Sequence, residues 1–478
     1  MKPYPPWMAI SRRLLLAGAI AATLVAAVVE EENWRGESAW RQFSRNCVTH
    51  GAPLEFDAYL PPPVPDDQNL FKTPVLARFL NENDPQTRAF NEYAKKNTFV
   101  WGLFTHGLGN WRKGEATDFV LACRQLRKTD IHSAPVDVQK AAEIVSTALD
   151  GMRPELDELC AAARLRPLAQ LTLRADRSPI MNSFEVIRFF ETALALRACA
   201  RIELGQSDQA FGDLYAGLRL AEGPFAYPAS IFVFAGGATA QMAIQPLWEG
   251  CAKNTWNEAQ LAQLQALLVR FQPLAKSAPA FRADRAAAAA HFDTSIKRPF
   301  WMIRGWWQLN KIAYLGAVTD LELATFDPAT GRLFLDGIAR AGEFARTQQD
   351  SCSPFAWLIR KEAPHIGRIA VVIGSSEHTF ILVRTVVALE RYRFHHGDYP
   401  GTLAELVPAW MPAMPHDVID GQPLRYQRTE NGRYRLYSIG QNGVDDGGTP
   451  PNPTPGYNPW TSAKDGDWCW LWPAVLKS

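Results

Sequence analysis

The sequence predicts an α+β protein with an N-terminal membrane helix, a large antiparallel helical domain, and a C-terminal long helix followed by a small antiparallel sheet. Three observations support this prediction: an uninterrupted apolar run near the N-terminus, helical periodicity over about residues 86–295, and short strand patterns near the C-terminus. A chain of 478 residues is too long for one typical core, so several domains are expected. We predict a membrane anchor or signal segment at 1–32, an extended proline-rich lead-in at 33–85, a helical domain at 86–362 and a C-terminal domain at 363–478.

The composition limits the classes of partner. Hydrophobic residues make up 47% of the chain and charged residues 21%, which is typical of globular proteins. Fifty basic residues stand against 49 acidic ones, and Lys and Arg never cluster beyond a pair, so we expect no nucleic-acid partner. The seven cysteines form no CxxC pair and have no His at zinc-ligand spacing, which argues against a structural zinc site.

The apolar run from Leu14 to Val29 predicts a membrane segment. Arg12 and Arg13 precede the run and three glutamates follow it, so the positive-inside rule places the N-terminus in the cytoplasm. The run is slightly shorter than the ~17–25 residues of a standard spanning helix, and snorkelling by the two arginines would lengthen it. We therefore predict a single-pass protein of the bacterial inner membrane with its bulk in the periplasm.

A cleaved signal peptide is the alternative to an anchor, with Val25 and Ala27 as the small residues before the cut. The glutamates directly after the apolar run favour the anchor, because they leave no polar cleavage region. Both interpretations export the body of the protein.

The lead-in contains one helical signal and one proline run. Trp34, Trp40 and Phe43 suggest a short amphipathic helix. The prolines of 61–65 must lie in extended backbone, because each one fixes φ and disfavours helix at the preceding residue. We expect this stretch to be a linker packed on the next domain, and a proline-rich docking peptide is the alternative.

The clearest part of the helical domain is a helix pair. Gly205 is expected to end the first helix and Gly223-Pro224 the second, which Asp208 opens. Leu196, Cys199 and Ile202 share one face of the first helix, and the second carries Phe211, Leu214, Tyr215 and Leu218 at i, i+3, i+4 and i+7. The pair resembles a single tetratricopeptide unit, with Ala210 at the small position, and no second copy follows at the 34-residue period.

Three further patterns complete the domain. Thr255 to Glu258 predicts a capping box in front of a leucine-rich helix, and Phe281 to Phe292 predicts another helix. Residues 296–318 mix tryptophans with Lys and Arg. That mixture suits a helix lying in lipid headgroups, but the favoured interpretation is a helix whose tryptophans dock on the helical domain.

The C-terminal domain begins with a long helix that ends at Gly397. Leu424 to Arg428 and Arg433 to Ile439 flank Asn431-Gly432, which predicts a β-hairpin. Trp468, Trp470 and Trp472 alternate with Cys469 and Leu471, which predicts a third strand with a buried tryptophan face.

From about Arg384 to Trp470 the sequence resembles the globular part of the type II secretion major pseudopilin, a protein G-like module. The resemblance rests on Ala388-Leu389-x-x-Tyr392, Gly397-Asp-Tyr-Pro400, Leu406-Val-Pro408, Pro415-His-Asp417 and Gly421-Gln-Pro-Leu-Arg-Tyr426. It implies a calcium ion in the loop after the second strand. The residues that match the family's ligand positions are the carbonyl of Ile439 and the side chains of Asn442, Asp465 and Asp467, with Asp445 and Asp446 as further candidates.

The chain departs from a true pseudopilin in the position of its long helix and in its calcium loop. The equivalent helix starts more than 360 residues into the chain and its first half carries Arg368, Glu377 and His378, so it is not expected to span a membrane. Asn442 replaces a carboxylate, and a long loop from Val444 to Lys464 intervenes. The alternative to a calcium site is that the aspartates are solvated turn residues.

The sequence contains none of the common catalytic motifs. Ser375 and Ser376 lie near His378, and His395, His396 and His416 are conceivable metal ligands, but helical neighbours of these types are more often incidental. We therefore expect a non-catalytic envelope protein that binds or organises an unknown protein partner. The alternatives are an enzyme of unrecognised type with a pocket between the helical and C-terminal domains, and an accessory component of a type II secretion-like machine.

Overall fold

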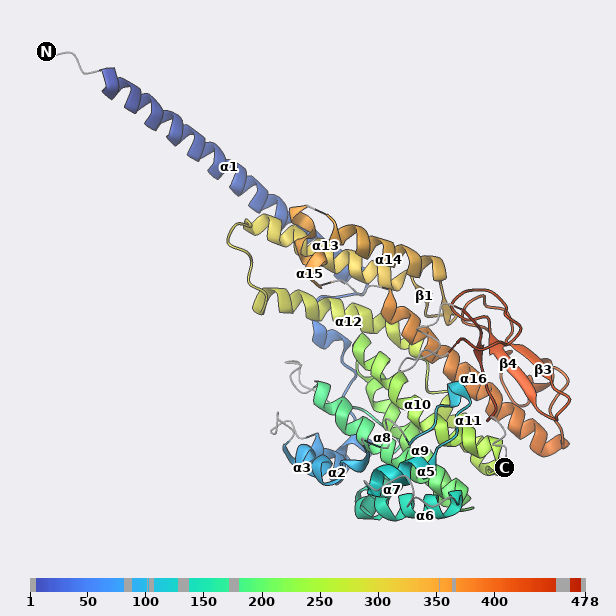
Figure 1. Ribbon diagram of the computed structural model, residues 1–478. Coiled ribbons are helices and arrows are strands. Elements are labelled where there is room, and N and C mark those ends of the chain that lie inside the picture. Colours follow the sequence, from blue (N-terminus) through green and yellow to red (C-terminus); the bar gives the residue numbers. More distant parts are fainter. Residues whose placement is uncertain are drawn as a thin grey trace. The chain divides into compact units, whose positions relative to one another are not determined.

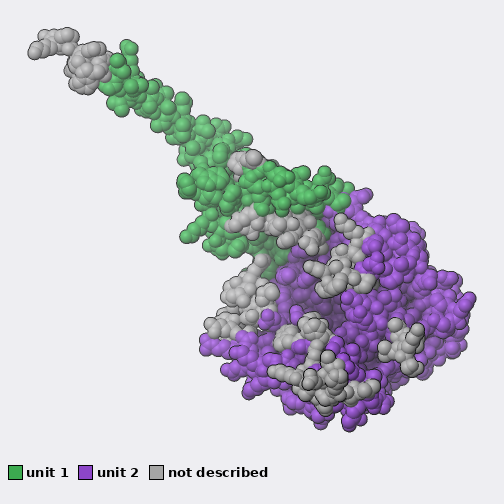
Figure 2. All heavy atoms as spheres, in the orientation of Figure 1, with its two compact units in different colours: residues 1–58, 282–322, 339–367 green, residues 59–281, 323–338, 368–478 purple. Residues whose placement is uncertain are grey.

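The computed structural model describes residues 6–80, 88–100, 102, 107–127, 137–171, 180–351, 353–362, 367–452 and 465–473. The protein is mostly helical and carries a small antiparallel sheet, as predicted (Figure 1). It divides into two compact units, coloured separately in Figure 2. Unit 1 comprises residues 1–58, 282–322 and 339–367, and unit 2 comprises 59–281, 323–338 and 368–478.

Unit 1 is helical. It contains α1 (Pro6–Thr49), the second half of α12 (Pro273–Thr294), nearly all of α13 (Arg304–Leu323), most of α14 (Leu335–Gln349) and α15 (Trp357–Glu362). Its main core is formed by Ala289, Phe292, Met302, Trp307, Leu315 and Leu358, with Trp40 and Phe43 packed against them. The tryptophans of the lead-in and of α13 therefore meet in one small core.

Helix α1 is long and apolar enough to cross a membrane. The side chains of its apolar stretch are exposed; Leu15, for example, is 75% exposed. Its one hydroxyl in this stretch, on Thr23, donates to the Ala19 carbonyl at 2.9 Å, which satisfies the donor within the helix. The helix continues through Thr49, so residues 33–49 of the predicted extended lead-in are helical, and the short helix expected at Trp34–Phe43 is part of α1.

Unit 2 holds the remaining helices and the sheets. Its helices are α2 (Pro74–Phe79), α3 (Arg88–Lys96), α5 (Phe119–Arg127), α6 (Val138–Leu149), α7 (Arg153–Leu165), α8 (Ile180–Glu203), α9 (Ser207–Ala226), α10 (Ser230–Ala252), α11 (Glu258–Leu268), the first half of α12, and α16 (Arg368–His396). A two-stranded sheet pairs β1 (Phe326–Asp327) with β2 (Arg332–Leu333).

The predicted helix pair is present as α8 and α9. Gly205 has φ +72°, a left-handed conformation that suits glycine after a helix end. The prediction that Gly223-Pro224 ends the second helix is wrong, because α9 continues to Ala226 with Pro224 inside it. Gly223 has another role: a Cβ there would lie 2.1 Å from the Phe71 ring, so glycine lets that ring pack on the helix.

The capping box before α11 lies two residues later than predicted. The Asn257 side chain accepts from the Gln260 N–H, and the Gln260 side chain accepts from the Asn257 N–H. Leu261, Leu264 and Leu268 are buried, as the leucine stripe indicates. The predicted alanine-rich helix is present within α12.

The C-terminal sheet has the order β3 (Arg425–Arg428), β4 (Tyr434–Ser438) and β5 (Trp468–Cys469), all antiparallel. Arg428 faces Tyr434 across the turn that holds Asn431-Gly432, so the predicted hairpin is confirmed. Trp468 and Trp470 are buried, as expected, but Cys469 is buried as well, so the strand does not alternate between core and solvent.

Helix α16 lies inside unit 2 and contacts α10, α11, β2 and β4. Most of its apolar length is buried, in contrast to α1, so it serves as a core helix. The large hydrophobic core of unit 2 includes Leu247 of α10, Leu382 of α16 and Trp468 of β5. Residues from the predicted helical domain and from the predicted C-terminal domain thus share one core.

The proline run at 61–65 forms neither helix nor strand, and hydrogen bonds fix it to the chain around Gln170. The Val64 N–H donates to the Gln170 side chain at 3.1 Å, and the Gln170 amide donates to the carbonyls of Pro61 and Pro62. This segment is therefore a packed linker.

Candidate functional site

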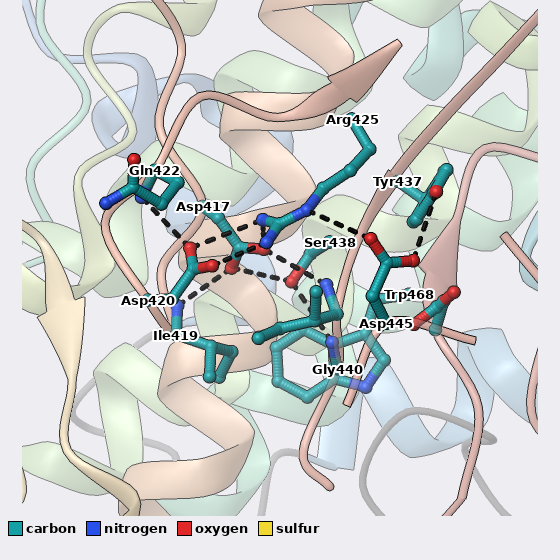
Figure 3. Close-up of polar contacts among 12 residues, drawn as sticks. Asp417, Ile419, Asp420, Gln422, Arg425, Tyr437, Ser438, Gly440, Asp445 and Trp468 are labelled. Carbon is teal, nitrogen blue, oxygen red and sulfur yellow. Dashed lines mark hydrogen bonds and ion pairs between the residues drawn. The ribbon is translucent and has the colours of Figure 1, made fainter. Parts of the chain in front are cut away.

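The loop between α16 and β3 places a buried carboxylate, Asp417, beneath the C-terminal sheet (Figure 3). Its Oδ1 accepts from the Ile419 N–H at 2.8 Å and the Ser438 hydroxyl at 2.7 Å. Its Oδ2 accepts from the Ile439 N–H at 3.0 Å and from Arg425 Nη1 at 2.7 Å. The loop is thereby joined to β3 and to the end of β4.

The surroundings of Asp417 indicate that its carboxylate stabilises the fold. Burial raises its pKa, and the hydrogen bonds from Ile419, Ser438 and Ile439 oppose that rise. Arg425 also pairs with Asp420, and its Nε lies 3.7 Å from Asp445 Oδ2. Since both oxygens of Asp417 already accept two donors, the carboxylate is arranged to hold the sheet and not to exchange a proton with a substrate.

The structure brings the predicted calcium-loop segments together. A Cβ on Gly440 would lie 2.4 Å from the Gly466 carbonyl, so the loop after β4 touches the chain that enters β5. Asp467 is buried, and its two oxygens accept from the N–H groups of Asp446 and Gly448 at 3.3 and 2.7 Å. Asp465 is exposed.

Two of the predicted ligands, Asn442 and Asp467, already use their side-chain oxygens as acceptors inside the loop. Asn442 Nδ2 donates to Asp446 Oδ2 at 2.9 Å, and Asn442 Oδ1 accepts from the Val444 N–H at 3.1 Å. Burial raises the pKa of Asp467, and the charges of Asp445 and Asp446 add to that rise. Among the described residues no three His, Cys, Asp or Glu side chains form a metal-binding group. The loop supplies oxygen donors of the kind calcium prefers, but as arranged they do not close a coordination sphere.

A second candidate site is a polar cavity of about 810 Å³ on the helix pair and its neighbours. It lies among α6, α7, α8 and α9, all within unit 2. Its charged lining consists of Arg153, Arg164, Arg197, Arg201, Asp150, Asp157 and Asp208. The lining carries four arginines and three aspartates, and a fourth aspartate, Asp213, lies buried beneath it and balances the remaining charge.

The floor of the cavity is a buried ion-pair network. Asp213 of α9 is fully buried and accepts from Arg197 Nη2 at 2.7 Å and from Arg201 Nη1 at 2.6 Å. Arg197 also reaches Asp157 at 2.8 Å. Burial raises the pKa of Asp213, and the two guanidinium groups oppose that effect. The floor is thus rigid and internally neutralised.

Arg164 differs from the other cavity arginines. It is exposed, and among the described residues it forms no ion pair, whereas Arg153 pairs with Asp150. A Cβ on Gly212 would lie 3.1 Å from Arg164 Nη2, so glycine at this position makes room for the guanidinium. Arg164 is therefore a free cation at the cavity, available to an anionic group.

The hydroxyl and histidine candidates are not assembled for catalysis. Ser375 and Ser376 donate to the Val372 carbonyl at 2.8 and 3.0 Å. His378 is buried, and its Nε2 lies 3.1 Å from the Trp468 carbonyl oxygen. The helical positions thus direct these groups to the backbone and not to one another.

The other three candidate histidines each contact a different group. His395 is near Glu258, with Nε2 3.5 Å from Oε1. His396 Nδ1 contacts the Tyr392 carbonyl at 2.9 Å, and His416 approaches Gly331. In the described part of the chain these histidines do not assemble a metal site.

Sequence reasoning did not find the cavity. Apolar periodicity does not reveal it, because that pattern describes the faces of α8 and α9 that pack on other helices. A signal was nevertheless present: Arg197 and Arg201 are four residues apart and so share a helix face, and Asp213 interrupts the apolar stripe of α9. Comparison with known families, with curated proteins and with solved structures finds no match to this chain.

Proposed function

We propose that this chain is a non-catalytic, membrane-anchored binding protein whose folded units lie outside the cytoplasm of a bacterial cell. The observation that carries the proposal is the exposed apolar stretch of α1, which is continuous with a folded, water-compatible unit. An apolar helix of this length without protein cover is stable in a lipid bilayer and costly in water.

The orientation follows from the charges that flank the stretch. Arg12 and Arg13 lie on its N-terminal side, and Glu30, Glu31 and Glu32 on the other. Basic flanks are retained in the cytoplasm, so the rest of the chain is exported. We keep the bacterial inner membrane as the location and an uncleaved anchor as the form.

Reporter fusions test this topology. Alkaline phosphatase fused after the last residue is active only outside the cytoplasm, whereas green fluorescent protein exported through the general secretory pathway is dark. We expect an active phosphatase fusion, a dark fluorescent fusion, and full retention in the membrane after carbonate washing. Bright fluorescence with inactive phosphatase would refute export, and release by carbonate would refute the anchor.

The cavity on the helix pair is the site we assign to ligand binding. Its ion-pair floor, which Asp213 neutralises, and the free guanidinium of Arg164 suit a segment of a partner protein that presents a carboxylate. A short acidic peptide labelled with a fluorophore is the probe, and binding is read by anisotropy on the detergent-solubilised full chain.

The matched variants are Arg164→Glu and Arg340→Glu. Both residues are exposed, both changes reverse one charge, and only Arg164 lines the cavity. We expect Arg164→Glu to weaken peptide binding at least tenfold and Arg340→Glu to leave it nearly unchanged. Equal weakening by both variants would show that the peptide responds to general charge, and absence of binding by the wild type would refute an acidic ligand.

The C-terminal module is proposed to be a pseudopilin-like domain reused as a scaffold. The chain order of a long helix, a hairpin and a third strand supports this proposal, as does the contact between the two predicted calcium-loop segments. Because α16 is a buried core helix, assembly into a secretion filament through it is not part of the proposal.

A further inference from the structure

We propose that the loop before α13, residues 295–303, is a second membrane contact, seated among the anionic lipid headgroups of the bilayer that α1 crosses. The inference rests on the proposed anchoring of α1 and adds a surface that fixes unit 1 against the membrane. Three observations support it: the start of α13 is fixed to α1 beside the apolar stretch, α13 runs away from that stretch, and the loop exposes aromatic and basic side chains.

The start of α13 is fixed to α1 directly after the apolar stretch. The Gly305 N–H donates to Asn33 Oδ1 at 2.9 Å, and Trp306 Nε1 donates to Glu32 Oε2 at 3.1 Å. Arg304 pairs with Glu37 at 2.8 Å. The apolar stretch ends at Val29, and three helical residues advance about 4.5 Å, so this joint lies close to the bilayer surface.

Two glycines make the joint tight. A Cβ on Gly305 would lie 1.9 Å from the Glu32 carbonyl oxygen, and a Cβ on Gly36 would lie 2.2 Å from the Gly305 carbonyl oxygen. The backbones of α1 and α13 therefore touch here, and the height of Arg304 above the bilayer is set by α1. This joint lies entirely within unit 1.

From the joint, α13 runs away from the apolar stretch. Lys311 Nζ lies 4.0 Å from the centre of the Trp40 ring, and Gly316 lies next to Phe43. Progress along α13 thus follows progress along α1 toward its C-terminus. The loop that precedes Arg304 consequently lies at the membrane end of α13, and Figure 1 shows it at the end from which the free part of α1 emerges.

The loop exposes two aromatic side chains to solvent, although the residue that follows them is buried. Phe300 is 98% exposed and Trp301 49% exposed, whereas Met302 is fully buried in the core of unit 1. Trp34, next to the Asn33 joint, is 64% exposed. Aromatic side chains at this height match the aromatic belt that membrane proteins place at the headgroup layer.

The basic residues of the loop favour anionic lipid headgroups, and not an apolar protein surface, as its binding partner. Lys297 and Arg298 are exposed and adjacent to the aromatic pair. Anionic headgroups attract such basic residues while the rings enter the layer below, a combination that an apolar protein patch would not satisfy. The same loop on a second copy of the chain would meet its own positive charge.

A fluorescent label on the loop tests the contact in the full chain. Phe300→Cys and, as the matched control, Val48→Cys are labelled with an environment-sensitive fluorophore; Val48 is also exposed, at 59%, belongs to the same unit, and lies on α1 about 28 Å beyond the end of the apolar stretch. Wild-type protein carried through the same labelling measures the background from native thiols. The proteins are reconstituted into vesicles of phosphatidylethanolamine and phosphatidylglycerol that carry a nitroxide at a shallow acyl position.

We expect the label at 300 to shift to the blue and to be quenched by the nitroxide at least twofold more than the label at 48. Replacing phosphatidylglycerol with phosphatidylcholine should reduce the quenching, and so should the variant K297E/R298E. Equal quenching at the two positions would refute the contact. A blue shift without quenching would also refute it, because protein and not lipid would then cover the loop.

Flotation of the same vesicles separates this inference from the proposed function. If the chain fails to float with lipid, the anchor itself is wrong. If the chain floats and the label at 300 is not quenched, only the headgroup contact is wrong. Carbonate-resistant flotation of the Phe300→Cys protein is therefore measured before each quenching experiment.

Discussion

Arg425 Nη1 donates to Asp417 Oδ2 at 2.7 Å, and this pair joins the loop that follows α16 to the first strand of the C-terminal sheet (Figure 3). Asp417 is fully buried and Arg425 is partly buried. A carboxylate in such a position is tolerated because all its donors are present together. Loss of one partner leaves the others with unsatisfied polar groups.

Asp417→Ala is expected to destabilise the protein by about 3–5 kcal/mol, the usual cost of breaking a buried pair. Ser438→Ala removes one hydroxyl donor from the same carboxylate and should cost only about 1 kcal/mol. Urea unfolding of the detergent-solubilised chain measures both. If the two variants lost the same stability, Asp417 would not be the centre of the network.

Glu322 of α13 predicts a dependence of stability on pH. Burial raises its pKa to about 7, opposed by a hydrogen bond from the Gly367 N–H at 3.0 Å. Because the folded-state pKa exceeds the ordinary value of 4.5, the folded state binds the proton more tightly. Its contribution to stability is complete below pH ~4.5 and is lost as the pH rises through about 7.

Glu322→Gln removes this titration and keeps an oxygen that accepts from Gly367. We expect the variant to be more stable than the wild type by about 3 kcal/mol at pH 8 and to approach it at pH 5. Thermal unfolding across this range is the measurement. A stability difference that does not change with pH would contradict the assignment.

His378 of α16 predicts the opposite sensitivity. Burial lowers its pKa to about 3, and the charge of Arg112 lowers it further, against the contact with the Trp468 carbonyl. The unfolded state then binds the proton more tightly than the folded state below pH ~6.5, so stability falls as the pH drops from there toward 3. At pH 5 the loss from this group is about 2 kcal/mol.

His378→Gln should flatten that acid limb, since a glutamine amide can still donate toward the Trp468 carbonyl and does not titrate. The comparison is the difference between the variant and the wild type at pH 5 and at pH 7. An unchanged acid limb would assign the sensitivity to other groups.

Calcium at the loop after β4 is expected to bind weakly, with a dissociation constant on the order of 10⁻⁴–10⁻³ M. The reason is that the ion must displace the hydrogen bond from Asn442 to Asp446 and compete with the N–H donors on Asp467. Millimolar Ca²⁺ should raise the thermal unfolding temperature by a few degrees in the wild type and not in Asp467→Asn. If Ca²⁺ and Mg²⁺ had the same small effect on both proteins, the loop would contain no calcium site.

Local sequence signals predicted the elements that depend on neighbouring residues. Asn431-Gly432 predicted the β3–β4 turn, and Gly205 the break between α8 and α9, because both effects arise from backbone conformation within a few residues. The prediction that Gly223 ends a helix was wrong because its role depends on a residue that is distant in sequence: the absence of a side chain at Gly223 makes room for the Phe71 ring. A local rule cannot distinguish a glycine that ends a helix from one that admits a neighbour.

The two candidate sites illustrate the same limit. The resemblance named Asn442 and Asp467, but only the folded chain shows that their oxygens already accept backbone N–H donors. The cavity arginines Arg197 and Arg201 have no local motif, because their shared partner Asp213 lies on another helix. Contacts of this kind depend on how the helices pack, so the sequence gives only a weak signal for them.

By itself the sequence determined that the chain starts with an apolar helix, continues through helices and ends in a small antiparallel sheet. These features follow from hydrophobic periodicity and turn chemistry, which act over a few residues. The charged residues of α16 already argued against a second membrane helix, but only the tertiary structure decided which elements cover it, namely α10, α11, β2 and β4. The physical reason is that burial depends on which other surfaces are available to cover a helix, and those surfaces come from distant parts of the chain.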